Sequence, residues 1–350
     1  MHMADALISP IVGGAMWAAT AGVAAYSIRK VQNEMDEKKI PLMGVMGAFI
    51  FASQMINFSI PGTGSSGHLG GGLILAILLG PYAGFLTMAS VLTIQALFFA
   101  DGGLLALGSN VFNLGFFPCF IAYPLIYKML MRKGYSTQRI FGASLFTAII
   151  GLQMGAFGVV LETFFSGKTE LPFGTFVLLM QPIHLAIGVV EGLVTTAIVT
   201  YIWKSRPEII EKAGSGEAIG NIPIKKVVAG LATVAVLSGV VLSWFASSNP
   251  DGLEWSMFKT AGKAELEAQD SIHQSLSELQ NKTAFLPGYD FKAPEKGTEQ
   301  SAGESEAAWP AVSGGTSTAG LIGGGMTLLL AGLVGTGISL AKRRKNGTPA

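Results

Sequence analysis

The chain has 350 residues, of which 50% are hydrophobic and only 13% are charged, and its mean hydropathy is +0.51. Soluble domains carry about 25% charged residues, so the composition excludes an ordinary soluble protein and predicts a polytopic membrane protein with a soluble portion. A net charge of +1, without a long basic block, gives no indication of nucleic-acid binding. The single cysteine excludes an internal disulfide and a cysteine-rich metal site.

Seven membrane crossings are predicted in the first 205 residues. A crossing needs about 20 apolar residues, and the run at 69–79 is short for one. Four basic residues lie in the loop that follows the first run, so the positive-inside rule predicts a cytoplasmic loop and an N-terminus on the outside. The predicted crossings are residues 10–28, 42–60, 69–79, 82–99, 104–131, 140–165 and 176–203.

The rest of the chain predicts a second, smaller unit. Residues 206–224 are polar and predict a cytoplasmic linker. Two further crossings, at 227–246 and 319–341, enclose a polar segment at 248–318 that is expected outside, with an amphipathic helix at about 261–281. The last crossing ends at Lys342-Arg-Arg-Lys345, which indicates a cytoplasmic C-terminus. The predicted division is therefore 1–205, a linker at 206–224, and 225–345.

The first two residues suit a metal ion. No basic region precedes the first apolar run, so a cleaved signal peptide is not expected and Met1 is expected to remain. The amine of Met1, the amide nitrogen of His2 and the imidazole of His2 can close two fused chelate rings. Three nitrogens, completed to a plane by a second imidazole, favour Ni(II) or Cu(II), whereas zinc prefers a tetrahedron.

His68 is the expected fourth nitrogen ligand. It lies in the Gly/Ser-rich loop at 61–72, and the predicted topology puts that loop on the same membrane face as Met1 and His2. The alternative is that His2 is a solvated terminal residue and His68 an ordinary loop residue. Two histidines alone favour that alternative, and the shared membrane face favours the metal site.

Ionisable and amide side chains also fall inside the predicted crossings, where such groups are usually functional. Asn110, Asn113, His184 and Glu191 are candidates for orienting the imidazoles or lining the route of the ion, and Glu162 lies near an outer end. The alternative is a structural hydrogen-bond network. Small residues spaced four apart in the first crossing, at 15/19, 18/22 and 21/25, fit either a partner subunit or packing within the bundle.

No nucleotide-binding loop, zincin motif or nucleophile elbow is present in the sequence. The chain is therefore expected not to be an enzyme and not to carry its own ATPase.

Four motifs carry a resemblance to a known family. They are Met1-His-Met-Ala-Asp-Ala-Leu-Ile-Ser-Pro10, Gly62-Thr-Gly-Ser-Ser-Gly-His68, Asp101-Gly-Gly-Leu-Leu-Ala-Leu-Gly-Ser-Asn110 and His184-Leu-Ala-Ile-Gly-Val-Val-Glu-Gly192. With these, residues 1–205 resemble the substrate-capture (S) components of cobalt/nickel energy-coupling factor transporters, the CbiM/NikM type. Residues 225–345, with Pro250-Asp-Gly-Leu-Glu254, are similar to the CbiN/NikN component, the PDGLE-type module. The chain thus resembles a fusion of the two.

The resemblance implies an all-α fold: a seven-helix S-component bundle plus a two-helix module with an extracytoplasmic loop. It implies that Met1, His2 and His68 hold Ni2+ or Co2+ as the transported substrate. It implies a transmembrane coupling (T) subunit and two ATPase subunits as partners, in the lipid bilayer of a bacterial or archaeal cytoplasmic membrane. The alternatives are a proton-coupled metal transporter using Glu162, His184 and Glu191, and an intramembrane metalloenzyme.

The role of the polar segment at 248–318 is a separate hypothesis. Residues 250–254 are expected to dock on the outer loops and to help the N-terminal segment and the His68 loop open and close over the metal. His273 and the acidic residues of the segment could instead store metal, although scattered carboxylates usually form a solvated face.

Overall fold

The computed structural model describes residues 2–34, 38–268, 270–292 and 309–345, and most of the regular structure there is helical. Among these residues, six helices are long and apolar enough to cross a membrane. They are α1 (Pro10–Glu34), α4 (Pro81–Phe99), the continuous run of α5 (Leu107–Val111), the π-helix η2 (Phe112–Tyr127), α6 (Lys128–Leu130) and η3 (Met131–Lys133), then α7 (Thr137–Phe165), α8 (Phe173–Ser205) and α13 (Gly314–Lys345).

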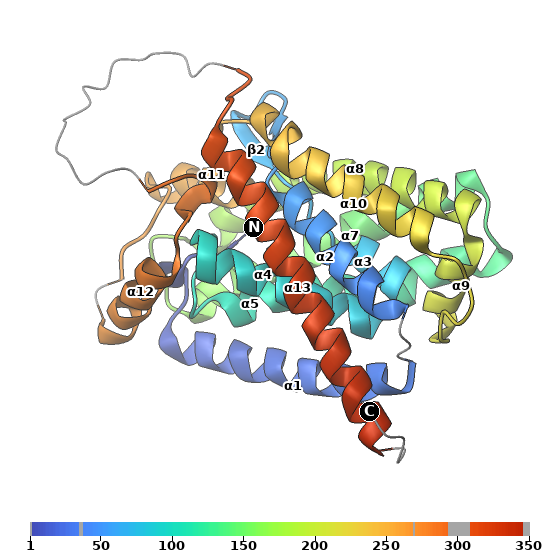
Figure 1. The fold of residues 1–350 in the computed structure, drawn as a ribbon. Coiled ribbons are helices and arrows are strands. Elements are labelled where there is room, and N and C mark those ends of the chain that lie inside the picture. The colour runs from blue at the N-terminus through green and yellow to red at the C-terminus, as the bar shows by residue number, and fades with distance from the viewer. Residues whose placement is uncertain (1, 35–37, 269, 293–308, 346–350) are drawn as a thin grey trace.

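Shorter elements connect and cover these helices (Figure 1). Helix α9 lies at one end of the bundle, and α11 and α12 lie at the other, together with a two-stranded hairpin (Figure 1). We call that second end the hairpin end. The shorter elements are η1 (Asp5–Leu7), α2 (Lys39–Gln54), β1 (Phe58–Ile60), β2 (Ser65–Gly67), α3 (Gly72–Leu79), α9 (Pro207–Ser215), α10 (Lys225–Val240), η4 (Leu242–Phe245), α11 (Gly252–Ala261), α12 (Ser271–Thr283) and η5 (Pro287–Tyr289).

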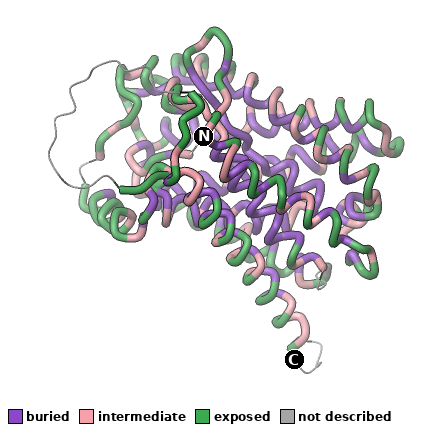
Figure 2. The backbone as a smooth tube through the Cα atoms, turned by 45° about the horizontal axis from the view of Figure 1, so that its top comes forward, coloured by how far each residue is buried: buried purple, intermediate pink, exposed green. Residues whose placement is uncertain are grey.

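The core lies on α2, α3 and α4. Every residue of α3 is buried, and 72% of the apolar part of α4 is buried, against 17% for α1. Figure 2 shows this difference as buried segments at the centre of the bundle and exposed residues on the helices around it. In lipid an apolar helix need not be covered by protein, so α1 remains available to a partner on its outer face.

The predicted second crossing, 42–60, is wrong at its end. Helix α2 stops at Gln54, and the chain then forms the antiparallel hairpin β1–β2, with Phe58 opposite Gly67 and Ile60 opposite Ser65. Two glycines of the turn, at positions 62 and 64, have φ of 77° and 74°, a left-handed conformation that suits glycine. The Gly/Ser-rich loop therefore makes a hairpin where a helix end was expected.

The predicted crossing at 69–79 contains only an eight-residue helix. Eight residues of α-helix span about 12 Å, so α3 alone is too short for the hydrocarbon. Residues 68–71, which lead into it from β2, are not helical, and Gly80 at its far end lies near the Ala213 carbonyl of α9. This segment therefore runs from the hairpin end to the α9 end, partly without helix. A Cβ on Gly72 would lie 2.3 Å from the Leu114 carbonyl oxygen, so α3 can approach η2 closely only with glycine there.

The polar stretch at 206–224, predicted as a linker, contains helix α9. Its apolar side is buried at Ile209, Ile210 and Ala213, and it packs on α3 and α8. Propensity favours this helix because Pro207 occupies its first turn and Gly216 ends it at a φ of 75°. The stretch is therefore folded onto the bundle where it was expected to be only a connection.

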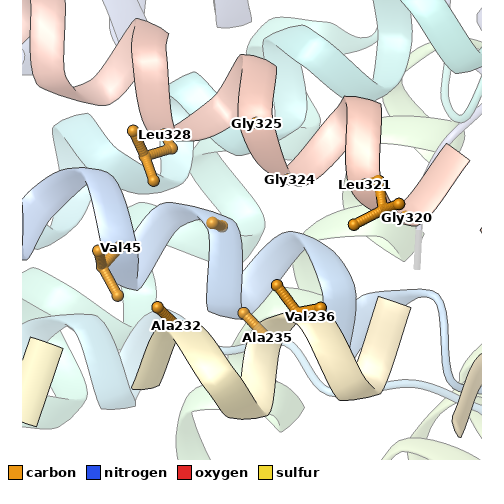
Figure 3. A pocket seen from close by; sticks show the side chains of 10 residues that line it. Val45, Ala232, Ala235, Val236, Gly320, Leu321, Gly324, Gly325 and Leu328 are labelled. Atoms are coloured by element: carbon orange, nitrogen blue, oxygen red, sulfur yellow. The ribbon is translucent and has the colours of Figure 1, made fainter. Parts of the chain in front are cut away.

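Helices α10 and α13 pack together on α2. Their backbones approach closely, since a Cβ on Gly320 would lie 2.2 Å from the Gly239 carbonyl oxygen. An apolar cavity of about 170 Å³ lies between the three helices, lined by residues such as Val45, Ala235 and Leu328 (Figure 3). None of its lining residues can ionise, so it is not a candidate metal site.

The amphipathic helix expected at 261–281 is wrong in its bounds. Helix α11 ends at Ala261, where Gly262 adopts a φ of 72°, and α12 starts ten positions later, at Ser271, with Asp270 as its N-cap. The Asp270 carboxylate accepts hydrogen bonds from the main-chain N–H groups of Ile272 and His273. The expected helix therefore begins at residue 271 and not at 261, because the glycine that ends α11 and the aspartate that caps α12 both fall within the predicted range.

Candidate metal site

Two histidines that are 66 positions apart meet at the hairpin end. The rings of His2 and His68 stack with centroids 4.9 Å apart and an interplanar angle of 14°. Only 6% of the His2 side chain and 8% of His68 are exposed. Burial lowers the pKa of both imidazoles to about 3, so both are neutral at pH 7, the form in which imidazole binds metals. Met1, the other predicted ligand residue, lies outside the described residues.

Asp101 and Tyr289 stand beside His2, and both were missed as site residues from the sequence. The Asp101 carboxylate lies 3.2 Å from Nδ1 of His2 and accepts a hydrogen bond from the hydroxyl of Tyr289. Burial raises the pKa of Asp101. A carboxylate on an imidazole N–H commonly fixes the ring's orientation. The sequence marked Asp101 only as the start of a turn, and Tyr289 had no signal at all.

Asn110 holds the main chain that carries His2. Its side chain accepts a hydrogen bond from the Met3 N–H at 2.8 Å and donates one to the Met3 carbonyl at 3.1 Å. Gly103 donates its N–H to the same carbonyl at 2.8 Å, and Asp5 accepts from the Ala106 N–H at 3.0 Å. The N-terminal segment is therefore held, at Met3 and at Asp5, by residues of the chain that follows α4.

Glu191 and Gln54 hold the chain that follows His68. The Glu191 carboxylate accepts the N–H groups of Gly70 and Gly71 at 2.9 and 3.0 Å, and Gln54 donates to the Gly70 carbonyl at 2.9 Å. Nδ1 of His68 lies 3.0 Å from the Leu69 carbonyl, an arrangement in which the neutral ring donates from Nδ1 and keeps its lone pair on Nε2. Glu191 thus acts on the His68 loop through the main chain.

The other predicted polar residues divide between two places. His184 donates from Nδ1 to the Met180 carbonyl at 2.8 Å and lines a cavity of about 10 Å³ together with His68. Asn113 turns away from the imidazoles and donates to Glu162 at 2.9 Å. Asn110 and Asn113, predicted to share a helix face, therefore have different partners.

The C-terminal unit contacts the hairpin directly. The Ser66 N–H donates to the Pro250 carbonyl at 2.8 Å, Ser66 and Asp251 form a parallel bridge, and the Trp255 indole donates to the Thr63 carbonyl at 3.0 Å. The prediction that residues 250–254 dock on the loop of His68 is confirmed by these contacts.

His273 makes a second contact, to the N-terminal segment. Its Nε2 lies 2.8 Å from the Asp5 carbonyl and 3.0 Å from the Ile8 carbonyl, while Nδ1 faces the Asp270 carboxylate. Both ring nitrogens therefore face acceptors. His273 is engaged with the chain, which argues against a role in metal storage.

Side chains alone do not complete a metal site here. Among the described residues, no group of three or more His, Cys, Asp or Glu side chains is placed to hold an ion. The paired imidazoles offer two nitrogens, so the remaining ligands would have to come from the main chain near His2. The fold and this pocket define a multi-pass helical membrane protein with a buried two-imidazole site at one end.

The chain belongs to the CbiM family. Residues 2–209 match the family model described as "Cobalt uptake substrate-specific transmembrane region", and residues 225–340 match the PDGLE domain. It therefore joins a CbiM-type region and a PDGLE module in one polypeptide.

Several relatives share most of the first region. A protein of Archaeoglobus fulgidus assigned as a fused nickel transport protein, NikMN, is 39% identical over 62% of this chain and 70% of its own. The fused nickel transport protein NikMN of Rhodobacter capsulatus is 32% identical over 60% and 64%. The cobalt transport protein CbiM of Geobacter sulfurreducens is 28% identical over 69% and 71%. A crystal structure of a truncated transition metal transporter is 30% identical, with a TM-score of 0.52 over 59% of this chain and 99% of that one.

Proposed function

We propose that the chain is the metal-capture subunit of an ATP-driven importer of the energy-coupling factor type, with Ni2+ or Co2+ as its cargo. The observation that carries the proposal is the stacked pair of His2 and His68. The fold does not require two neutral imidazoles to be buried against each other beside the start of the chain. They do supply the nitrogens that a divalent first-row ion prefers.

The proposed ligands are the Met1 amine, the amide nitrogen and imidazole of His2, and the imidazole of His68. A chelate through the His2 amide closes its six-membered ring at Nδ1, the imidazole nitrogen nearer the main chain. That nitrogen faces the Asp101 carboxylate at 3.2 Å, so the ion would replace this contact when it binds. Asn110 and Glu191 support the site by holding the main chain after each histidine.

Four nitrogens in a plane tilt the proposal mildly toward nickel. Relatives named for nickel and for cobalt transport both match the chain, so the names of the relatives do not choose between the metals. Titration of one protein sample with both ions gives the preference directly.

The proposed partners are a transmembrane coupling subunit and two ATPase subunits. The small residues at 15, 18, 19, 22 and 25 of α1 are exposed, which supports a docking face and disfavours packing within the bundle. The proposed topology puts the hairpin end outside and the α9 end inside. It agrees with the basic residues at 29, 30, 132, 133, 204 and 206, which all fall toward the inner side.

The proposal is tested at the N-terminus. Adding one residue before Met1 converts the amine into an amide and moves the chelate. We expect the extended chain to lose Ni2+ binding in calorimetric titration, while a chain tagged after Ala350 binds normally. An extended chain with unchanged affinity and absorption spectrum would contradict the terminal chelate.

A second test addresses the energy source, where the alternative is a proton-coupled transporter using Glu162, His184 and Glu191. Contacts disfavour that alternative, because Glu162 is paired with Asn113 and Glu191 holds two main-chain N–H groups. We expect metal uptake to require coexpressed coupling and ATPase subunits. Uptake that persisted without them and followed the proton gradient would support the alternative.

A further inference from the structure

The segment 250–254 of the C-terminal unit has a defined place for each residue. Pro250 offers its carbonyl to Ser66, two positions before His68, and Ser66 donates a second hydrogen bond from its hydroxyl to the Asn249 carbonyl. The carbonyls of 249 and 250 therefore follow the edge of β2. These hydrogen bonds fix the position of residues 249 and 250 along β2. As a result, the next residue, Asp251, is held beside the His68 loop.

Gly252 lets this segment press against α8. A Cβ at this position would lie 2.5 Å from Cγ2 of Ile183 and 3.4 Å from Cε1 of His184. The next residue, Leu253, is only 2% exposed. Close packing on both sides leaves little freedom to the main chain of Asp251.

Asp251 is fixed by its own helix as well. One carboxylate oxygen accepts the N–H groups of Leu253 and Glu254, both at 2.8 Å, and the Glu254 carboxylate accepts the Asp251 N–H at 3.0 Å. This capping box places a carboxylate at the start of α11, where the positive end of the helix dipole favours the ionised form.

The same residue also faces the histidines. Asp251, His68 and His184 line one cavity of about 10 Å³, which has room for about one water molecule. Nε2 of His184, a residue that is 1% exposed, has no hydrogen-bond partner within the described residues. Burial lowers the pKa of His2 and His68, and the negative charge of Asp251 acts in the opposite direction on both.

Resting on the proposed function, we propose that Asp251 is the residue through which the C-terminal unit acts on metal capture. Its carboxylate attracts the divalent cation to the His68 loop, and it offsets part of the charge of the ion after the ion has lost its water. Two neutral imidazoles exert no long-range pull on a cation, whereas a fixed negative charge in a partly enclosed site does. Asp251 is thus a positioning residue, and the PDGLE signature is the means of placing it.

The test compares Asp251→Asn with the unchanged full chain, tagged after Ala350. Asparagine is as good an N-cap as aspartate, so the variant removes the charge and keeps the start of α11. We expect the association rate of NiCl2 or CoCl2 in stopped-flow absorbance to fall about tenfold or more at low ionic strength. The difference should shrink at about 1 M salt, where the screening length is about 3 Å.

Two further variants separate charge from structure. Glu254→Gln removes the same charge from an exposed position three residues away, and we expect the rate to change less than about twofold because exposed charges are screened. Asp251→Glu keeps the charge but weakens the cap, and should retain most of the wild-type rate. If Asp251→Glu were as slow as Asp251→Asn, a negative charge at this position would not be enough to speed loading, and the inference would fail.

Three results would overturn the inference: an Asp251→Asn rate equal to wild type at all ionic strengths, equal slowing by Glu254→Gln, or a slow Asp251→Glu variant. The proposed function fails in a different way, since the unchanged chain would then bind neither ion. A wild-type chain that binds metal with a nitrogen-ligand spectrum while Asp251→Asn loads normally would leave the proposed function standing and remove the inference alone.

Discussion

The two imidazoles are enclosed from two sides that are built differently. We call the inner side the floor: Gln54, Asn110 and Glu191, each bonded to the main chain next to a histidine. The outer side is the roof, made of Asp251, Trp255, His273 and Tyr289 of the C-terminal unit. The floor contacts join residues of the CbiM-type region to each other. Every roof contact joins the C-terminal unit to the CbiM-type region.

Burial separates the two sides further. The three floor side chains are 2–4% exposed, and breaking a buried hydrogen bond leaves a polar group without a partner at a cost of about 1–3 kcal/mol. In the roof, Asp251, Trp255 and Tyr289 are only partly buried, and Asp270 behind His273 is exposed, so water can replace part of what is lost. The comparison teaches that the floor fixes the geometry of the ligands, while the roof is the side that can open at lower free energy.

The largest expected effect follows from removing a ligand held by the floor. His68→Ala should weaken Ni2+ binding about 100-fold or more, because one of four proposed nitrogens is lost and the chelate cannot close its plane. His184→Ala should cost less than about tenfold, since that ring is engaged with Met180 and only borders the same cavity. Calorimetric titration of both variants compares them. Equal losses would move His184 among the ligands.

The second-largest effect is expected from breaking a hydrogen bond of the floor itself. Glu191→Gln replaces one acceptor by a donor that faces a main-chain N–H, so Gly70 or Gly71 loses its partner. We expect a loss of about 10–100-fold in metal affinity, the usual range for residues that orient a ligand. Glu162→Gln is the matched control, a second buried glutamate that accepts a hydrogen bond from Asn113, and should change affinity little. If both variants lost affinity equally, general destabilisation of the bundle would explain the result.

Removing the whole roof should affect rate more than coordination. Deleting residues 221–350 should leave a domain that inserts in membranes and keeps the nitrogen-ligand spectrum, because the floor is intact. This expectation is supported by the solved truncated transition metal transporter, 99% of which is matched by 59% of this chain. Transport with the partner subunits should fall about tenfold or more. Loss of the spectrum would mean that the C-terminal unit supplies ligands, and full-rate transport would make the unit dispensable.

A single roof contact should have a smaller effect. His273→Ala removes the buried side chain that holds the carbonyls of Asp5 and Ile8, and loss of such a hydrogen bond costs about 1 kcal/mol, or about fivefold in opening. Hydrogen exchange of residues 3–8 should quicken by that factor, and bound Ni2+ should dissociate faster. Ser277→Ala, an exposed change on the same helix, serves as the control. Unchanged exchange in His273→Ala would show that the contacts with Asn110, Gly103 and Ala106 suffice to hold the segment.

The smallest expected effect is on how the free energy of unfolding depends on pH. The pKa of His2 and of His68 is about 3 in the folded chain, against 6.5 ordinarily, so the unfolded chain takes up these protons first on acidification. The stability of protein prepared without metal should therefore be complete above pH 6.5 and fall from there toward pH 3. We expect the Tm in detergent to drop by about 3–6 °C more between pH 7.5 and 5 in the wild type than in His68→Gln. Identical drops in both would indicate that His68 is solvated.

Much of the site could be predicted from the sequence. The histidine at the start of the chain and the histidine of a Gly/Ser-rich loop are local patterns, and the basic residues between apolar runs predict that both lie on one side, where the structure has their rings stacked. Long apolar helices such as α7 and α8 are likewise set by composition, because lipid requires every backbone group to be bonded within the helix. What failed was local competition: a hairpin turn ended α2 early, and a glycine and an aspartate divided the expected helix at 261–281.

Only the tertiary structure decided which distant groups surround the imidazoles. Asp101 reads as a turn residue and Tyr289 as an ordinary aromatic, and nothing in either neighbourhood predicts that they meet beside His2. Glu191 is predicted to orient the imidazoles or to line the route of the ion, but the sequence does not show that its carboxylate binds the main-chain N–H groups of Gly70 and Gly71, 120 residues or more away. The sequence by itself determined which residues could bind a metal, since that depends on side-chain chemistry and short spacing. The packing of helices determined which charges and hydrogen bonds reach them, because contacts between segments over 100 residues apart depend on the whole fold.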